Sequence, residues 1–309
     1  MDSLRPISEA ILLAGPTAVG KSAVALLLAE RVKGEIISVD SMQVYRGLEI
    51  GTAKPDAADR ARVPHHLLDV AELSESFDAA KFAAQAHQVV IEIRSRGRTP
   101  VLCGGTGLYF RAYLDGLGDA PAADAALRSQ LEQTPVEILL EELKSRDPAA
   151  YEKIDRKNPR RVVRAVEIIR ITGKPVSAQR AEWSAQPSAS ARHFFCLNRP
   201  TDDLRERIDR RVDEMFQKGL VEETRGLLDK GLAKNKTAMQ ALGYRQVVEH
   251  LRGERSLPET IELVKTKTRH FARRQLTWFR KQPGIQWVEV AGDESAQSVA
   301  DRILKLIGS

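Results

Sequence analysis

The 309-residue sequence predicts an α/β fold, with a central parallel sheet flanked by helices and an inserted all-helical domain. Three observations lead to this prediction. Short apolar runs alternate with helical patterns up to about Gly116, only helices and loops are indicated from there to residue 192, and a further apolar run follows at 194–197. We therefore expect an α/β core formed by residues 1–118 and 193–309, and a helical insertion at 119–192.

The first predicted strand leads into a glycine-rich loop. Residues 10–14 form a short apolar run, and residues 23–32 are rich in Ala, Leu and Val, as expected of a buried strand and a helix. Inward-turned N–H groups, a lysine and a helix N-terminus suit a phosphate ester, and Ser22 can ligate Mg²⁺. The segment predicts a P-loop NTPase-like core because it matches G-x-x-x-x-G-K-[ST] in full: Gly15, Pro16, Thr17, Ala18, Val19, Gly20, Lys21 and Ser22.

The second predicted strand, 35–39, ends at Asp40 and is followed by Ser41, Met42 and Gln43. In open parallel sheets, catalytic groups sit at such strand ends. Residues 44–64 then read as a loop. The pair His65-His66 invites a metal interpretation, but neighbouring residues on a strand point to opposite faces and no other ligand is suitably spaced, so a structural role is favoured.

A third helix and strand follow. Ser76 is expected to cap a helix that ends at Gly97, and the strand 99–103 runs into Gly104-Gly105-Thr106. Phosphate-loop hydrolases hold Mg²⁺ with an Asp at a strand end, yet no acid stands here. ATP hydrolysis is thus disfavoured, and Asp40 becomes the carboxylate nearest to the loop by topology.

The inserted segment ends in a well-marked helix, with Asn158 as N-cap, Pro159 in the first turn and Gly173 as the stop. One face of this helix is apolar, and its arginines (Arg160, Arg161 and Arg164) cluster elsewhere. Such a cluster is either a solvated helix face or a phosphate-contacting patch. The helices expected in the segment are 124–133, 136–146, 149–154 and 159–172.

After the strand at 194–197, helical patterns run to Gly219 and from 220 to 230, and a long helix covers 259–281. Between Lys265 and Lys281 this helix carries seven Lys or Arg residues and no acid, with aromatic residues interleaved. That combination suits base stacking and phosphate contact. Residues 285–288 predict an edge strand and residues 298–307 a closing helix.

Composition limits the function classes. The net charge of +6 arises after the phosphate-loop segment: residues 1–118 hold 13 basic and 14 acidic side chains, whereas 199–309 hold 22 and 17. A polyanionic partner would explain this excess. The first six residues lack the apolar core of a signal peptide, and no run is long enough to span a bilayer. We expect a cytoplasmic monomer without a membrane partner, in which Cys103 and Cys196 are buried, reduced thiols.

Together these residues resemble one family. The chain is similar to the bacterial-type tRNA dimethylallyltransferases, also called tRNA isopentenyltransferases, over nearly its whole length. The matching pieces are GPTAVGKS (15–22), ISVDSMQVYRGLEIGTAKP (37–55), PHHLLD (64–69), GGTGLY (104–109), PRRVVRAVE (159–167), GYRQ (243–246) and RRQLTWFRK (273–281).

The resemblance implies a reaction. A dimethylallyl group would pass from dimethylallyl diphosphate to N6 of the adenosine at position 37, beside the anticodon of tRNA, with Mg²⁺ present. The loop at 15–22 would hold the diphosphate as the leaving group, with Ser22 on the metal. Asp40 would act as general base, and Thr106 would contact the nucleotide near the reacting nitrogen. Arg225 is a further candidate for closing on the diphosphate.

The resemblance also implies contacts with the anticodon stem-loop of tRNA. The expected positions are Asp40, Ser41, Met42, Gln43, Thr106, Arg128, Arg160, Arg161, Val162, Val163, Arg164, Gln240, Ala241, Leu242, Gly243, Tyr244, Arg245, Arg273, Arg274, Gln275, Leu276, Thr277, Trp278, Phe279 and Arg280. The target base would have to leave the stack to reach a pocket.

Three alternatives remain open on the sequence. A nucleoside or nucleotide kinase would use the same loop for ATP and Asp40 to activate a hydroxyl. An RNA-binding switch that responds to a nucleotide would need no prenyl chemistry, and its function would survive the change Asp40→Asn. Free AMP could replace tRNA as acceptor, although the basic helix after Lys265 favours tRNA.

Overall fold

The computed structural model describes residues 10–117, 121, 124–178 and 193–308. The chain divides into two compact units, residues 1–114 with 190–309, and residues 115–189. The expected domain limits, 118/119 and 192/193, fall at the margins of the described ranges, and the first six residues lie outside them.

The larger unit is built on one parallel six-stranded sheet, which confirms the predicted fold class. Its order is β3-β2-β4-β1-β5-β6, and every pairing is parallel. The register aligns Ala14, Gly104 and Val39, so the loop after β1, the turn after β4 and Asp40 begin side by side at one edge. The strands are β1 (Ile11–Ala14), β2 (Gly34–Val39), β3 (His65–His66), β4 (Thr99–Gly104), β5 (Phe194–Asn198) and β6 (Gln286–Glu289).

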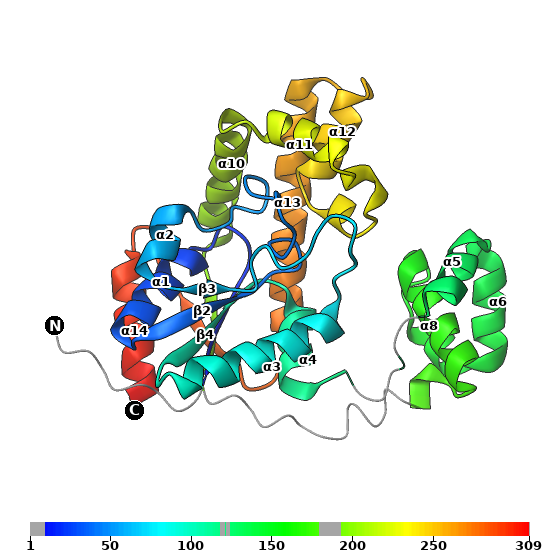
Figure 1. Ribbon diagram of the computed structural model, residues 1–309, viewed down its shortest axis with the longest axis horizontal. Coiled ribbons are helices and arrows are strands. Elements are labelled where there is room, and N and C mark those ends of the chain that lie inside the picture. The colour runs from blue at the N-terminus through cyan, green and yellow to red at the C-terminus, as the bar shows by residue number, and fades with distance from the viewer. Residues whose placement is uncertain (1–9, 118–120, 122–123, 179–192, 309) are drawn as a thin grey trace. The chain divides into compact units, whose positions relative to one another are not determined.

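Helices cover both faces of this sheet (Figure 1). Ile11 and Leu13 point into a core shared with α1 and α14, whereas Phe194, whose register partner is Leu12, contacts Phe110 of α4 on the opposite face. The alternation follows from the two-residue period of a strand. The helices of this unit are α1 (Lys21–Arg31), α2 (Ala57–Arg62), α3 (Ala79–Ser95), α4 (Gly107–Asp115), α10 (Thr201–Gln217), α11 (Leu220–Asp229), α12 (Tyr244–Leu251), α13 (Leu257–Phe279) and α14 (Ala296–Gly308).

Three of these helices, α2, α4 and α12, were not predicted. The helix α2 lies in the segment interpreted as a loop, and the side chain of Asp56 caps it by accepting a hydrogen bond from the Asp59 amide. The cap of α3 also differs from expectation: Asp78, not Ser76, accepts the hydrogen bond from the Lys81 amide. Both Ser and Asp are good N-caps, and the first residue after Asp78, Ala79, is buried.

Three smaller predictions for the larger unit concern its edge strand, a histidine and the two cysteines. The strand β6 lies at the edge of the sheet, as expected. His66 Nε2 lies 2.6 Å from a carboxylate oxygen of buried Glu35, so this histidine has the structural role favoured above. Both cysteines are free; Cys196 is buried and Cys103 half-buried, and burial raises the pKa of Cys103 to about 11.

The smaller unit is helical. It contains α5 (Ala125–Gln133), α6 (Val136–Arg146), α7 (Pro148–Lys153) and α8 (Pro159–Thr172), around a core to which α8 contributes most residues. The caps of α8 are those expected: the Asn158 side chain accepts a hydrogen bond from Arg161, and Gly173 adopts a left-handed conformation with φ of 71°.

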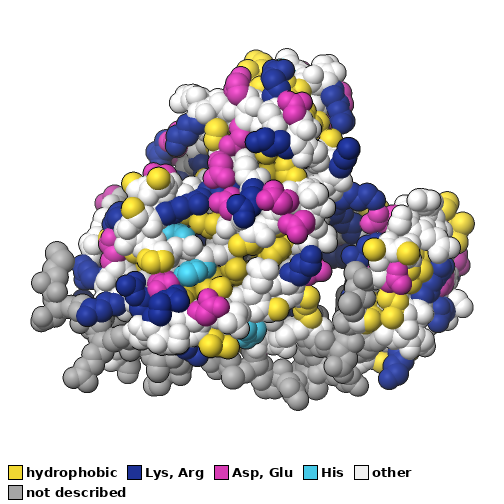
Figure 2. Space-filling view, in the orientation of Figure 1, with side chains coloured by type: hydrophobic (Ala, Val, Ile, Leu, Met, Phe, Trp, Pro, Cys, Tyr) yellow, Lys and Arg dark blue, Asp and Glu magenta, His cyan; other side chains and the backbone are white. Residues whose placement is uncertain are grey.

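Charge is mixed over the surface of the larger unit on the side drawn in Figure 2, where Lys and Arg side chains are interspersed with Asp and Glu. Ion pairs such as Arg62–Glu30 and Arg96–Glu35 account for part of this pattern. Within the described parts of the chain, no helix is both long enough and apolar enough to cross a lipid bilayer.

Candidate active site

The loop after β1 has the backbone needed to surround an anion. Gly15 has a φ of 149°, and a Cβ there would lie 2.9 Å from the carbonyl oxygen of Leu197 in β5. Ala18 and Gly20 also have positive φ, at 63° and 105°, just before α1 begins. These conformations turn successive amides inward, and only glycine fits the close approach at position 15.

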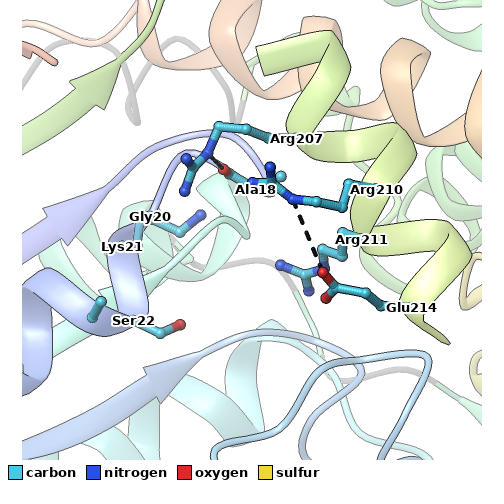
Figure 3. A pocket seen from close by; sticks show the side chains of 9 residues that line it. Ala18, Gly20, Lys21, Ser22, Arg207, Arg210, Arg211 and Glu214 are labelled. Atoms are coloured by element: carbon cyan, nitrogen blue, oxygen red, sulfur yellow. Dashed lines mark hydrogen bonds and ion pairs between the residues drawn. The ribbon is translucent and has the colours of Figure 1, made fainter. Parts of the chain in front are cut away.

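A cationic cavity of about 250 Å³ lies against this loop (Figure 3). Lys21 and Ser22 line it from the start of α1, and three arginines reach it from α10. Arg207 Nε donates a hydrogen bond to the Ala18 carbonyl at 3.0 Å, which ties α10 to the loop. Four cations against one carboxylate make the cavity suited to a polyanion such as a diphosphate. The lining residues are Ala18, Gly20, Lys21, Ser22, Ala23, Arg207, Arg210, Arg211 and Glu214.

The arginines of α10 are functional candidates that the sequence analysis missed. Arg207, Arg210 and Arg211 are spaced i, i+3 and i+4, which places them on one face of a helix. This spacing is visible in the sequence. It does not reveal that this face of the helix lies against a loop almost two hundred residues earlier in the chain. Arg225, the candidate named instead, is exposed on α11 and lines neither this cavity nor the second one described below.

Lys21 is a strongly perturbed cation of this cavity. Burial, together with the neighbouring charge of Arg211, lowers the pKa of its ammonium group to about 8. Its Nζ donates a hydrogen bond to the Pro16 carbonyl at 2.7 Å. A bound anion would favour the charged form of this lysine.

We expect the affinity for inorganic diphosphate to fall as the pH rises above about 8. In the empty site Lys21 is neutral above that pH, so binding must take up a proton, at a cost of up to about tenfold in affinity per pH unit. Titration calorimetry between pH 7 and 9.5 measures this, in roughly half-unit steps. Lys21→Arg keeps its charge, so its profile should be flatter; identical profiles for both proteins would contradict the assignment.

A second cavity, of about 330 Å³, lies at the adjacent strand ends. Thr17 and eight other predicted site residues line it, and α10 and α13 contribute its apolar walls. Arg211 lines both cavities, so the two are neighbours. The lining residues are Thr17, Asp40, Ser41, Met42, Gly51, Thr52, Thr106, Arg211, Val212, Met215, Gln240, Ala241, Leu242, Val264, Thr268, Phe271 and Arg274.

Asp40 and Thr106 are held on the wall of this second cavity by backbone hydrogen bonds. Asp40 Oδ1 accepts from the amides of Met42 and Gln43, at 2.8 and 3.3 Å. Thr106 Oγ1 accepts from the Ser41 amide at 3.1 Å, which directs the hydroxyl proton elsewhere. The site thus offers a carboxylate that can accept a proton beside a hydroxyl that can donate one.

Other predicted RNA-contacting residues instead support the walls. The Gln43 side chain bonds to Ser38 and to the Thr52 carbonyl. Buried Tyr244 accepts a hydrogen bond from the Gly51 amide at 3.0 Å and donates one to Glu223 at 2.6 Å. Burial raises the pKa of Tyr244 strongly, so it remains a neutral phenol. Its hydroxyl holds the Gly51 segment of the second cavity.

The nearby turn is only partly exposed. Ala241 and Gly243 are buried, Gln240 and Leu242 line the second cavity, and Arg245 is exposed and pairs with Glu249.

The helix α13 does not expose its basic residues uniformly. Lys265 and Arg269 form ion pairs with Asp213 and Asp209 of α10. The residues of the 273–280 motif alternate between surface and interior: Arg273, Arg274, Thr277 and Arg280 are exposed, Leu276 and Trp278 are half-buried, and Gln275 and Phe279 are buried.

In the smaller unit, part of the predicted patch is internal. The side chains of Val162 and Val163 are buried in the helical core and cannot present themselves to RNA. Arg128 and Arg164 pair with fully buried Glu167, and although burial opposes it, these hydrogen bonds hold the pKa of Glu167 below its usual range. Arg160 and Arg161 remain exposed, as an RNA contact would require.

Comparison with known proteins assigns the family. The model of the family "IPP transferase" matches residues 43–282. A tRNA dimethylallyltransferase of Trichlorobacter lovleyi is 48% identical over 282 residues, covering 90% of this chain and 92% of that protein. One from Geobacter sulfurreducens is 43% identical over 300 residues, covering 95% of this chain and 96% of that protein.

Solved structures agree with this assignment. The tRNA isopentenylpyrophosphate transferase of Bacillus halodurans superimposes with a TM-score of 0.71 at 38% identity, covering 98% of this chain and 97% of that one. A eukaryotic dimethylallyltransferase acting on tRNA gives 0.74 at 28% identity, covering 91% and 73%. The predicted resemblance is confirmed, and the chain belongs to the IPP transferase family, that of the tRNA dimethylallyltransferases.

Proposed function

We propose that this protein transfers a dimethylallyl group from dimethylallyl diphosphate to N6 of adenosine 37 in tRNA, releasing diphosphate and forming N6-isopentenyladenosine. The observation that supports this best is the pair of adjoining cavities that share Arg211. One is cationic and lies against the phosphate loop, and the other holds Asp40 and Thr106 between apolar walls. A diphosphate ester and a nucleobase would meet between them.

On the donor side, the first cavity would bind the leaving group. Lys21 and the arginines of α10 would face the diphosphate, and the inward amides of the loop would contact its oxygens. As the bond between the allylic carbon and oxygen breaks, negative charge grows on the departing oxygen. Cations already placed there stabilise that charge without reorganising.

On the acceptor side, the lone pair of N6 would attack the allylic carbon, and the N6 proton would pass to Asp40. The amine becomes acidic as its bond to carbon forms, so an ordinary carboxylate suffices if it is well placed. Thr106 would donate its hydroxyl proton to the base or ribose. The adenosine would be drawn out of the anticodon loop to enter the second cavity, because its N6 is otherwise stacked.

Mg²⁺ fits the first cavity as a partner of the diphosphate. The Ser22 hydroxyl stands in the cavity, and Mg²⁺ prefers oxygen ligands and retains several waters. Among the described residues, no group of three or more His, Cys, Asp or Glu side chains could hold a metal by itself. Ser22 would therefore supply one ligand, and the bound metal would neutralise charge on the leaving group.

The exposed cations of α13 and α8 would contact the phosphates of the anticodon stem-loop, namely Arg273, Arg280, Arg160 and Arg161. We further propose that the protein acts as a monomer. Light scattering at micromolar concentration tests this.

The test of the proposed function is mass spectrometry of tRNA nucleosides after incubation with dimethylallyl diphosphate and Mg²⁺. We expect N6-isopentenyladenosine in tRNA, and none with ATP in place of the donor or with EDTA added. AMP is offered in place of tRNA in a parallel reaction. Phosphorylation from ATP without any prenylated product, or equal prenylation of AMP and tRNA, would contradict the proposal.

A further inference from the structure

The side chain of Gln275 joins the two halves of the site. Its Oε1 accepts a hydrogen bond from the Thr17 amide, and its Nε2 donates one to the Gly105 carbonyl, both at 2.9 Å. It lies on the buried face of α13 and is 7% exposed. One primary amide therefore connects the phosphate loop after β1 with the turn after β4.

The fit around this amide is close. A Cβ at Gly105 would lie 2.2 Å from Gln275 Nε2, and one at Gly107 would lie 2.2 Å from the ring of Trp278. Both distances are far below van der Waals contact, so the two glycines are what allow α13 to rest directly on this turn. Thr106 lies between these two glycines in the chain, so the residues on both sides of it pack against α13.

The two residues that hydrogen-bond to the Gln275 side chain, Thr17 and Gly105, lie next to the groups proposed to bind the donor and the acceptor. Thr17 belongs to the phosphate loop and lines the second cavity. Gly105 precedes Thr106, whose hydroxyl oxygen accepts from the amide next to Asp40. A displacement at Gln275 would therefore change the separation between the bound diphosphate and the groups that receive the adenine.

We infer that Gln275 is a positioning residue that sets the distance between the donor loop and the Asp40–Thr106 side of the site, rather than a contact to RNA. This inference rests on the proposed function. Its neighbours Arg273 and Arg274 are exposed, whereas the Gln275 amide faces inward with both polar atoms engaged. Glutamine suits the position because its amide accepts and donates at once.

The variant Gln275→Glu distinguishes a positioning role from a contact to RNA. The carboxylate still accepts from the Thr17 amide, but it cannot donate to the Gly105 carbonyl and it repels that oxygen. We expect kcat for prenyl transfer to fall by about 10- to 100-fold, because misplacements near 1 Å have effects of this order. The KM for the anticodon stem-loop should stay within about twofold, since the exposed arginines are unchanged.

Gln282→Glu is the matched control. It makes the same substitution seven residues further along, in the bend that follows α13, where the amide donates a hydrogen bond to the Trp278 carbonyl at 3.4 Å. We expect kcat and KM of this control variant to remain within about twofold of those of the unaltered protein. A raised KM with unchanged kcat in Gln275→Glu, or no change in either, would overturn the positioning role.

A second measurement needs neither a stable variant nor turnover. Hydrogen exchange at the Thr17 amide of the unaltered protein should be slowed at least about tenfold relative to an open loop. Exchange at the unprotected rate would overturn the bridge even if Gln275→Glu did not fold. Absence of prenyl transfer by the unaltered protein would instead refute the proposed function, while a slowed Thr17 amide would still support the bridge.

Discussion

Replacing Asp40 by Asn is expected to lower kcat for prenyl transfer by about 10³-fold while anticodon stem-loop binding changes by less than about threefold. Asparagine keeps an oxygen that can accept from the Met42 and Gln43 amides, so the local turn is preserved. What it loses is the capacity to take the N6 proton. Single-turnover formation of N6-isopentenyladenosine measures the first quantity, and fluorescence anisotropy with a labelled stem-loop measures the second.

Asp56→Asn is the matched control for this variant. Asp56 makes a similar bond, accepting from the Asp59 amide at 2.8 Å, but it caps the exposed helix α2 and lines neither cavity. Its turnover should be unchanged within about twofold. An Asp40→Asn protein with undiminished turnover would show that another group accepts the proton and would revive the alternative of an RNA-binding switch.

The second large effect is expected at Arg211, which lines both cavities. Arg211→Gln should reduce kcat by about 10²- to 10³-fold, as is found when a group that stabilises developing charge is removed. Burial lowers the pKa of this guanidinium, which nevertheless remains a cation at neutral pH. In a partly desolvated site, the electrostatic interaction of this cation with negative charge is stronger than it would be in water. Rapid-quench kinetics with saturating donor measure the effect.

Arg205→Gln provides the control on the same helix. Arg205 is exposed on α10 and lines neither cavity, so the same loss of charge should change kcat by less than about twofold. Affinity for inorganic diphosphate should also weaken in Arg211→Gln. If both arginine variants lost activity equally, the effect would be one of overall charge, and the placement of Arg211 at the reacting centre would be refuted.

Local signals in the sequence predicted much of the fold. The helix α8 was predicted with correct bounds, because Asn158, Pro159 and Gly173 each act on the adjacent backbone. The helix α4 was missed because its first turn follows glycines that favour other conformations, and contacts such as Phe110 with Phe194 stabilise it. Tertiary packing overrides weak propensity in such segments.

The residues of the candidate site also fall into two groups, those that the sequence predicted and those that only the structure revealed. Asp40 could be named because strand ends of a parallel sheet share one edge, and a strand end is visible in sequence, whereas Thr106 was named from the family resemblance. Arg211 could not, because helical spacing shows which residues share a face but not what that face meets. Arg225, which the family resemblance implied as a further candidate, is exposed on the next helix and lines neither cavity.

The sequence by itself determined the phosphate loop, the family, most of the strands and helices along the chain and the residues that follow each strand, since all of these depend on short segments. Only the tertiary structure decided that Arg211 lies between two cavities and that Gln275 faces inward to Thr17, a contact across 258 positions. The physical reason is that such contacts depend on strand order and helix packing, which arise from the whole core and leave no periodic trace in any one segment.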